Sequence, residues 1–443
     1  MNKEEIVRET RGPAGRVAVV RWLLAVSLLA VPGLALAATP DAEPEPGPAP
    51  APGPATTPAV TQDAAAAEAK PRLDIYGFGM LDMGYQTKQN DPNWFDVVRP
   101  TKLPAFKDQY GADGHFYAGV RQSRLGVKGF IPTGAGEIKT IFEFELFGTG
   151  VDAGQTTFRL RHAWGELGHF GAGQYWSTFM DPDVFPNELE YWGPNGLVWF
   201  RNVQFRWMPI KEDNRELFIA LERPGATADA GRFTDRIELQ NILGRFPVPD
   251  VAAHYKIGRD WGHFQAAGLY RRINWDDVLE DPFELSGHAN GWGVNLSGIY
   301  KISKDTVKLE ATFGDGIENY MNDAPVDIGV KNNLTNRITP VLGVALPVFG
   351  MSAFYDKTWS DKWTSTAGYS RLNIDNSNAQ LPIDFKNGQY ALANLLYYPV
   401  PDVMMGGEFQ WGKRENFSDG FSFSDYRIQF SFRYNFMYKL AAK

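Results

Sequence analysis

The chain has 443 residues, carries 44 Lys and Arg against 52 Asp and Glu, and contains no Cys. The missing Cys excludes a disulfide framework, a thiolate metal site, a cysteine nucleophile and a lipid anchor on an N-terminal Cys. The net charge of −8 argues against a nucleic-acid coat, which needs a basic surface. Aromatic residues make up 14% of the chain and Gly is abundant at 45, which favours an all-β protein over a bundle of membrane helices.

Residues 1–37 have the pattern of an export signal. Arginines from Arg8 to Arg21 make the start basic, Trp22–Ala37 is apolar, and Ala35-Leu36-Ala37 is a small-residue cleavage site. A membrane-anchor helix is the alternative, but the apolar run is shorter than the ~20 residues that span a bilayer. We predict a cleaved signal peptide at 1–37.

Residues 38–72 are rich in Pro and Ala. Up to residue 71 this segment has no apolar side chain larger than Ala apart from Val60, so it cannot bury enough surface to offset the entropy of ordering it. We predict a disordered periplasmic linker at 38–72, in part extended as polyproline II. The alternative is a tolerated tail without a role.

The region 73–436 alternates apolar and polar residues with a period of two, as strands of a membrane barrel do. In the last segment one face carries Ile428, Phe430, Phe432, Tyr434 and Phe436, and the other carries Arg427, Gln429, Ser431, Arg433 and Asn435. In another, Phe158, Leu160 and Trp164 lie opposite Arg159 and Arg161. The same pattern recurs within 122–130, 137–147, 202–207 and 405–411.

The connections between these segments alternate between short and long. Short ones lie near 132–136, 168–171, 209–215, 258–262, 303–305, 360–362 and 399–402, and long ones near 88–114, 148–156, 177–196, 223–249, 275–290, 315–347, 375–388 and 414–424. Seven short turns and eight long loops predict about sixteen strands, with both ends on the short-turn side. This is the pattern of an outer-membrane barrel at 73–436, followed by a tail at 437–443.

A barrel of this size encloses an aqueous channel. The long loop at 177–196 combines the acids Asp181, Asp183, Glu188 and Glu190 with four aromatic residues. We expect it to fold into the lumen as a constriction, because its aromatic residues make full solvation unfavourable. A solvated surface loop is the alternative.

Basic residues on the polar faces of the early strands are candidate channel-lining residues. They are Arg124, Lys128, Arg159, Arg161 and Arg206. Arginines in such a wall attract anions and bind carboxylates with two hydrogen bonds, so we predict anion preference. The alternative is that they pair with lumen acids such as Glu143 and Glu145 and only stiffen the wall.

No enzyme signature is present. The sequence lacks H-E-x-x-H and G-x-S-x-G, and its six His show no metal-ligand spacing. We expect no cofactor, no metal and no enzymatic activity. An outer-membrane hydrolase with a Ser/His pair on the lipid rim is a weaker alternative.

Several stretches resemble one known family. They are VRQSRLGVKGFIP at 120–132, TFRLRHAWGELG at 157–168, GQYWSTFMDPDVFP at 173–186, GEFQWGKREN at 407–416 and RIQFSFRYNF at 427–436. The chain resembles the DcaP-like porins of Gram-negative outer membranes over nearly all of 73–436. The pattern S-R-L-G-x-K-G at 123–129 is common to many porins, whereas G-Q-x-W-S-x-F-x-D at 173–181 is more specific.

This resemblance implies a homotrimer of sixteen-stranded barrels, passive diffusion and a preference for small anions such as dicarboxylates. It also implies basic constriction residues, here Arg124, Lys128, Arg159 and Arg161. Two features depart from the family. Some members have a coiled coil before the barrel, where this chain has the Pro/Ala linker, and the tail at 437–443 follows an aromatic strand end.

The sequence therefore predicts a porin in the outer membrane, surrounded by lipid, that passes small anionic solutes and binds no nucleic acid. A general or sugar-selective porin is the alternative, in which the aromatic residues of 177–196 would stack on sugar rings. A barrel that conducts nothing and serves as a scaffold is a further one.

Overall fold

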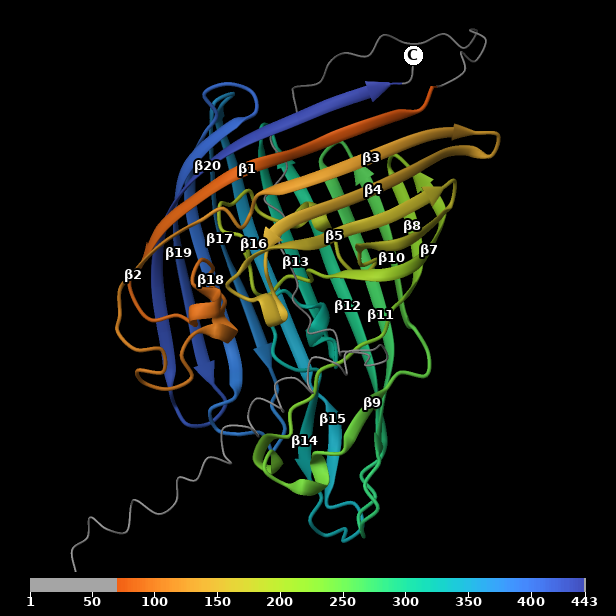
Figure 1. Cartoon of the computed structure of the whole chain (residues 1–443), viewed down its shortest axis with the longest axis vertical. Helices are drawn as coiled ribbons and strands as arrows, with labels where there is room; N and C mark the ends of the chain where they lie inside the picture. Colours follow the sequence, from red (N-terminus) through yellow and green to blue (C-terminus); the bar gives the residue numbers. More distant parts are fainter. Residues whose placement is uncertain (1–69, 442–443) are drawn as a thin grey trace, which may run out of the picture. The chain divides into compact units, whose positions relative to one another are not determined.

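The computed structural model describes residues 70–441 (Figure 1). The predicted signal peptide at 1–37 and most of the predicted linker at 38–72 lie outside the described residues. Eighteen strands form one sheet, and a separate pair of strands forms a second. Strand β1 pairs with β20 on one side and with β3 on the other, which closes the sheet into a barrel.

All neighbouring strands are antiparallel. The strands are β1 (Arg72–Gln86), β2 (His115–Gly119), β3 (Arg124–Thr133), β4 (Gly136–Phe147), β5 (Thr156–Leu167), β6 (Phe170–Trp176), β7 (Arg201–Glu212), β8 (Arg215–Glu222), β9 (Ile242–Arg245), β10 (Asp250–Arg259), β11 (Gly262–Asp277), β12 (Gly287–Ile302), β13 (Asp305–Asp315), β14 (Ile328–Asn332), β15 (Val341–Ala345), β16 (Pro347–Ser360), β17 (Trp363–Ile374), β18 (Phe385–Tyr397), β19 (Val403–Asn416) and β20 (Ser422–Ala441).

The barrel has sixteen strand positions, as the sequence predicts. Strands β2 and β3 share one position, because both pair with β1. Strand β9 pairs with the end of β11, whose other part pairs with β10, so β9 and β10 share another position. The hairpin of β14 and β15 is the separate sheet.

The helical segments of the described chain are short 3₁₀ turns. They are η1 (Pro92–Trp94), η2 (Pro100–Lys102), η3 (Gly150–Asp152), η4 (Pro182–Val184), η5 (Gly231–Phe233), η6 (Ile237–Leu239) and η7 (Glu318–Tyr320). Within residues 70–441, no helix has the length and apolar character required to cross a membrane.

The seven predicted short turns each join two neighbouring strands of the barrel. They connect β3 to β4, β5 to β6, β7 to β8, β10 to β11, β12 to β13, β16 to β17 and β18 to β19. The eight longer connections leave from the opposite end. Tight turns need unusual backbone angles, and Gly168 between β5 and β6 has a φ of 57°. The alternation of turn chemistry along the chain thus predicted the strand number correctly.

The outer surface of the barrel is apolar and its inner face is polar. On β20, Ile428 and Phe430 are 49% and 54% exposed, whereas Gln429 and Ser431 are fully buried. Because neighbouring strand residues point to opposite faces, this alternation places the apolar side chains outside and the polar ones inside. Such a belt of exposed apolar residues is suited to contact with lipid.

Strand β5 carries a bulge at Arg161, where the pairing with β4 jumps by one residue. A bulge shifts the rest of its strand by one residue, so the faces exchange beyond it. Trp164 therefore faces the interior and is 6% exposed. Strict alternation placed Trp164 outside with Leu160, and that prediction was wrong. The ring lies over Gly171, where an added Cβ would be 2.0 Å from it.

The last strand extends further than predicted. Strand β20 runs to Ala441, and Met437–Ala441 pairs with Arg72–Tyr76 of β1 (Figure 1). Residues 437–441 are therefore part of the barrel sheet rather than a tail, and Arg72 begins a strand rather than ending the linker. The reason is that β1 starts early enough to give these residues a complete antiparallel partner.

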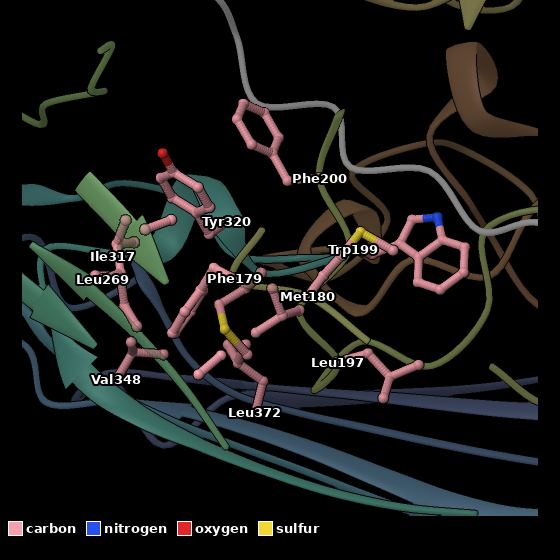
Figure 2. Close-up of a cluster of buried hydrophobic side chains, with 14 of the residues drawn as sticks. Phe179, Met180, Leu197, Trp199, Phe200, Leu269, Ile317, Tyr320, Val348 and Leu372 are labelled. Carbon is pink, nitrogen blue, oxygen red and sulfur yellow. The ribbon is translucent and has the colours of Figure 1, made fainter. Parts of the chain in front are cut away.

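The interior of the barrel is filled by loops. Figure 2 shows a buried apolar cluster that includes Phe179 and Trp199 from the loop between β6 and β7, and Tyr320 from the loop after β13. The wall contributes inward side chains such as Leu269 of β11 and Leu372 of β17. The loop at 177–200 therefore packs inside the barrel with the burial of a protein core.

Three loops interlock inside the barrel through Arg99. Its guanidinium lies 4.2 Å from the ring centre of Trp94 and 3.7 Å from that of Trp192. Its Nε donates to Asp323 at 2.9 Å. These residues belong to the loops after β1, β6 and β13, so one buried cation ties all three together.

Candidate functional site

The backbone of the loop at 177–200 is held by side chains of the barrel wall. Glu408 of β19 accepts hydrogen bonds from the amides of residues 189 and 190 at 2.8 and 3.1 Å. Glu310 of β13 accepts from the amide of residue 198 at 2.6 Å, and Ser370 of β17 from that of residue 196 at 2.8 Å. These three strands lie on the side of the barrel away from β6 and β7, where the loop begins and ends, so they fix it across the lumen.

Asp181 and Asp183 of this loop are paired with bases on the wall. Asp181 lies 2.7 Å from Nε2 of His263, accepts from Ser297 at 2.9 Å and lies 3.4 Å from Lys256. Asp183 forms an ion pair with the same Lys256. Burial alone would raise the pKa of Asp181, but the His263 hydrogen bond and the Lys256 charge outweigh it and hold the pKa well below its usual value.

Asp181, Asp183 and His263 also have the spacing of metal ligands, with ligand atoms within 4.8 Å of one another. However, the Lys256 ammonium already contacts both carboxylates. Lys256 therefore supplies the positive charge that a metal ion would otherwise supply. The arrangement fits a set of ion pairs that hold the loop to strands β10 and β11.

Glu188 and Glu190 are buried where the loop meets β19. Both carboxylate oxygens of Glu188 lack a hydrogen-bond partner among the described residues. Burial raises its pKa well above the usual value, and the charges of Glu408 and Glu190 add to this. Glu190 accepts from the amides of residues 98 and 193, but burial still raises its pKa to about 7.

Docking of the loop at 177–200 is expected to weaken as the pH rises from about 5 to about 8. An undocked Glu190 loses its proton near the ordinary pKa of 4.5, whereas the docked one keeps it to about 7. Between these values the undocked loop binds fewer protons, so raising the pH favours undocking, and the penalty is complete above about 7.

Hydrogen exchange of peptides from 185–195, corrected for the intrinsic pH dependence, measures this effect. Protection should fall with rising pH, and Glu190→Gln should remove the part of the dependence that Glu190 contributes, leaving the part that Glu188 contributes. Glu212→Gln, at the exposed end of β7, is the matched control and should leave the pH dependence intact. Protection that rises with pH would contradict the assignment.

Two of the predicted channel-lining arginines are bound within the wall. Arg161 donates from Nε to Glu143 and from Nη1 to Glu145, both at 2.7 Å. Arg124 lies 3.8 and 3.6 Å from the same two carboxylates, and Tyr191 of the loop donates to Glu145. This is the arrangement that the sequence left open as the alternative, in which the arginines stiffen the wall.

The other predicted basic residues lie in three different settings. Lys128 is partly buried, with its ammonium 4.7 Å from the ring centre of Tyr76. Arg159 is also partly buried and lies on β5 ahead of the bulge. Arg206 lines a cavity on the short-turn side of the loop. Of the five basic candidates, Arg206 lines this cavity and the other four do not.

This cavity has a volume of about 850 Å³. It extends from the loop at 177–200 to the short turns, because Lys304 lies in the turn between β12 and β13 and Thr358 lies close to that between β16 and β17. Five basic side chains line it against three acidic ones. They are Arg206, Lys256, Lys304, Lys308 and Lys357, and Asp183, Glu216 and Asp356.

The four lysines of the cavity were missed by sequence reasoning. The candidates were restricted to the early strands, whereas these lysines lie on or beside β10, β13 and β16. A signal was present for Lys308, which shares the polar face of β13 with Thr306, Glu310 and Thr312. It could have been found by applying the alternation to every strand.

A closed antiparallel barrel of sixteen strand positions, with an apolar outer belt and a polar interior crossed by a loop, defines an outer-membrane channel of the porin type. Residues 114–436 match the family model described as DcaP outer membrane protein. The chain belongs to the DcaP outer membrane protein family, and its place is the outer membrane. This confirms the family resemblance.

Solved structures with the same fold include the following three proteins. The outer membrane channel DcaP of Acinetobacter baumannii is 20% identical, with a TM-score of 0.68 over 84% of this chain and 99% of that one. An anion-selective porin from Comamonas acidovorans is 10% identical, with a TM-score of 0.54 over 83% and 100%. The trimer form of OmpT from Vibrio cholerae is 13% identical, with a TM-score of 0.50 over 83% and 100%. A comparison with curated protein sequences finds no match.

Proposed function

We propose that the protein is a passive diffusion channel that favours small organic anions such as dicarboxylates, and that it works as a homotrimer. The observation that supports this is the excess of basic over acidic side chains lining the cavity of about 850 Å³ below the loop. A cleft with low-dielectric walls and one prevailing sign of charge raises the local concentration of counter-ions. The DcaP family resemblance implies the same preference.

The loop at 177–200 acts as the constriction in this proposal. It crosses the lumen and is anchored on several strands, so solutes have to pass beside it. Arg124 and Arg161 are held by Glu143 and Glu145. In the cavity Lys308 and Lys357 are likewise paired, with Asp356 and Asp305. The cavity cation that meets the solute is therefore Arg206, which forms no ion pair among the described residues. The remaining N-terminal assignments, a cleaved signal at 1–37 and a disordered periplasmic linker before the barrel, belong to the same proposal.

The sugar-selective alternative has less support. It needs the aromatic residues of the loop as an accessible stacking surface. Phe179, Phe185, Tyr191 and Trp192 are each at most 2% exposed and pack against other protein atoms. Rings buried in this way have no face left for a sugar.

The sign of ion selectivity tests the proposal directly. Purified trimers in a planar bilayer under a KCl gradient should give a reversal potential of the anion-selective sign, with three equal conductance levels. Succinate should block or permeate, and maltotriose should do neither. The double variant Lys304→Glu and Lys357→Glu should shift the reversal potential toward cations, whereas Lys439→Glu, on the exposed end of β20, should not.

Cation selectivity of the unmodified channel would show that the acids outweigh the lysines and would refute the anion preference. Current block by maltotriose would favour the sugar-selective porin. A correctly folded barrel without conductance would refute the channel itself.

A further inference from the structure

The cavity on the short-turn side of the loop at 177–200 has two walls of different chemistry. Strands β6, β8 and β10 contribute Tyr175, Trp176, Phe218 and His254. Strands β13 and β16, further round the barrel, contribute Lys308 and Lys357. The first side is rich in aromatic rings and also carries Lys256 of β10, whereas on the second side Lys308 and Lys357 are ion-paired with Asp356 and Asp305. A simple diffusion path for hydrated ions would not need the rings.

The aromatic wall surrounds a fixed positive charge. The Arg206 guanidinium lies 5.7 Å from the ring centre of Tyr175 and 5.6 Å from that of Phe218. Its Nε donates to Gln204 at 3.1 Å, and its Nη2 donates to the carbonyl of Trp176. These contacts hold the guanidinium in one place, so a carboxylate that reaches it from the cavity has aromatic rings beside it.

Further apolar surface lies in the same cavity. The ring of His254 packs on Phe218 with ring centres 4.8 Å apart, and Met180 and Ile299 also line the space. Water forms few favourable interactions with such an apolar surface. A flat apolar group that covers the surface and releases this water therefore binds favourably. A short aliphatic dicarboxylate would use the charged groups and leave this wall unoccupied.

From this arrangement we propose that the cavity binds aromatic carboxylates, with the ring against the wall formed by Tyr175, Trp176 and Phe218 and the carboxylate at Arg206 or the lysines. The volume of about 850 Å³ lies within the range of sites for small organic molecules. This inference rests on the proposed anion channel and specifies its substrate class.

Benzoate and cyclohexanecarboxylate test the proposal, because they have the same charge and similar size but only benzoate has an aromatic face. Both are added to single trimers of the mature protein in a planar bilayer, and their binding constants are obtained from current fluctuations. Benzoate should bind about threefold to tenfold more tightly, the ratio expected for one aromatic contact.

Phe218→Leu removes one of the three rings but keeps an apolar side chain, and it should lower the ratio of the two binding constants, because Tyr175 and Trp176 remain in the wall. Phe205→Leu is the matched control, because Phe205 lies on the outer face of β7 and is 50% exposed; the ratio should stay unchanged. Should Phe218→Leu fail to fold, equilibrium dialysis of both acids against unmodified trimers in detergent still measures the preference.

The outcomes separate the two proposals. Equal binding of both acids by an anion-selective channel would overturn the aromatic preference and leave the anion channel standing. A cation-selective channel would refute the proposed function first. Maltotriose binding that is lost in Phe218→Leu would show that the aromatic wall serves sugars, and it would overturn this inference.

Discussion

Replacing residues 178–199 by a short Gly-Ser turn is expected to raise the single-channel conductance several-fold. Trp176 and Arg201 are paired neighbours on β6 and β7, so a short turn can join the strands without distorting them. The replacement removes the loop's contribution to the apolar cluster of Figure 2, which includes Phe179, Met180, Leu197 and Trp199. Because a barrel of sixteen strands has an interior wide enough for an aqueous channel, the emptied space should conduct ions.

Conductance in symmetric KCl measures this effect, after heat-modifiable electrophoretic mobility has shown that the barrel is closed. A matched control shortens the tip of the β14–β15 hairpin at 333–338, which is largely exposed. The control should conduct like the unmodified protein. Unchanged conductance without residues 178–199 would mean that another loop limits the current.

Arg161→Met is expected to lower the free energy of unfolding by about 3–5 kcal/mol, because it leaves Glu143 and Glu145 buried after losing their closest cation. Arg124 remains near both carboxylates, but at 3.6 Å or more. The urea midpoint of the barrel in detergent should fall accordingly. An unchanged midpoint would show that the two carboxylates are neutral or well hydrated.

Two further variants separate the buried charge from other effects. Arg161→Met combined with Glu143→Gln should recover much of the loss, because the remaining carboxylate of Glu145 still has Arg124 and Arg201 beside it. Arg215→Ala breaks the exposed ion pair with Glu212 at the turn between β7 and β8 and should change the free energy of unfolding by less than about 1 kcal/mol.

Much of the barrel was predictable from local features. Strand alternation depends on the backbone pleat, and short turns depend on residues that tolerate tight backbone angles, so both can be recognised in the sequence. The exceptions occur where pairing with a strand distant in the sequence sets the direction of a side chain or the length of a strand. The bulge at Arg161 moved Trp164 to the inner face, and the early start of β1 drew residues 437–441 into β20.

The candidate site was less predictable. The alternation of side chains along each strand placed Arg124, Arg161 and Arg206 together on the inner face. It could not show which of them would form an ion pair with a carboxylate. Glu143 and Glu145 take up the charge of Arg161, whereas Arg206 lines the cavity, where it donates to Gln204 and to the carbonyl of Trp176. That difference depends on side chains from other strands and on the loop packed against them.

The sequence by itself therefore determined the fold class, the number of strands, the family and the outward face of each regular strand, because these depend on short-range periodicity and turn chemistry. Only the tertiary structure decided which side chains contact one another inside the barrel. Acids of the loop are matched with Lys256 and His263, and lysines of β13 and β16 face Arg206 across a cavity. These groups are far apart along the chain, and their charges are set by burial and by neighbours that barrel closure alone brings together.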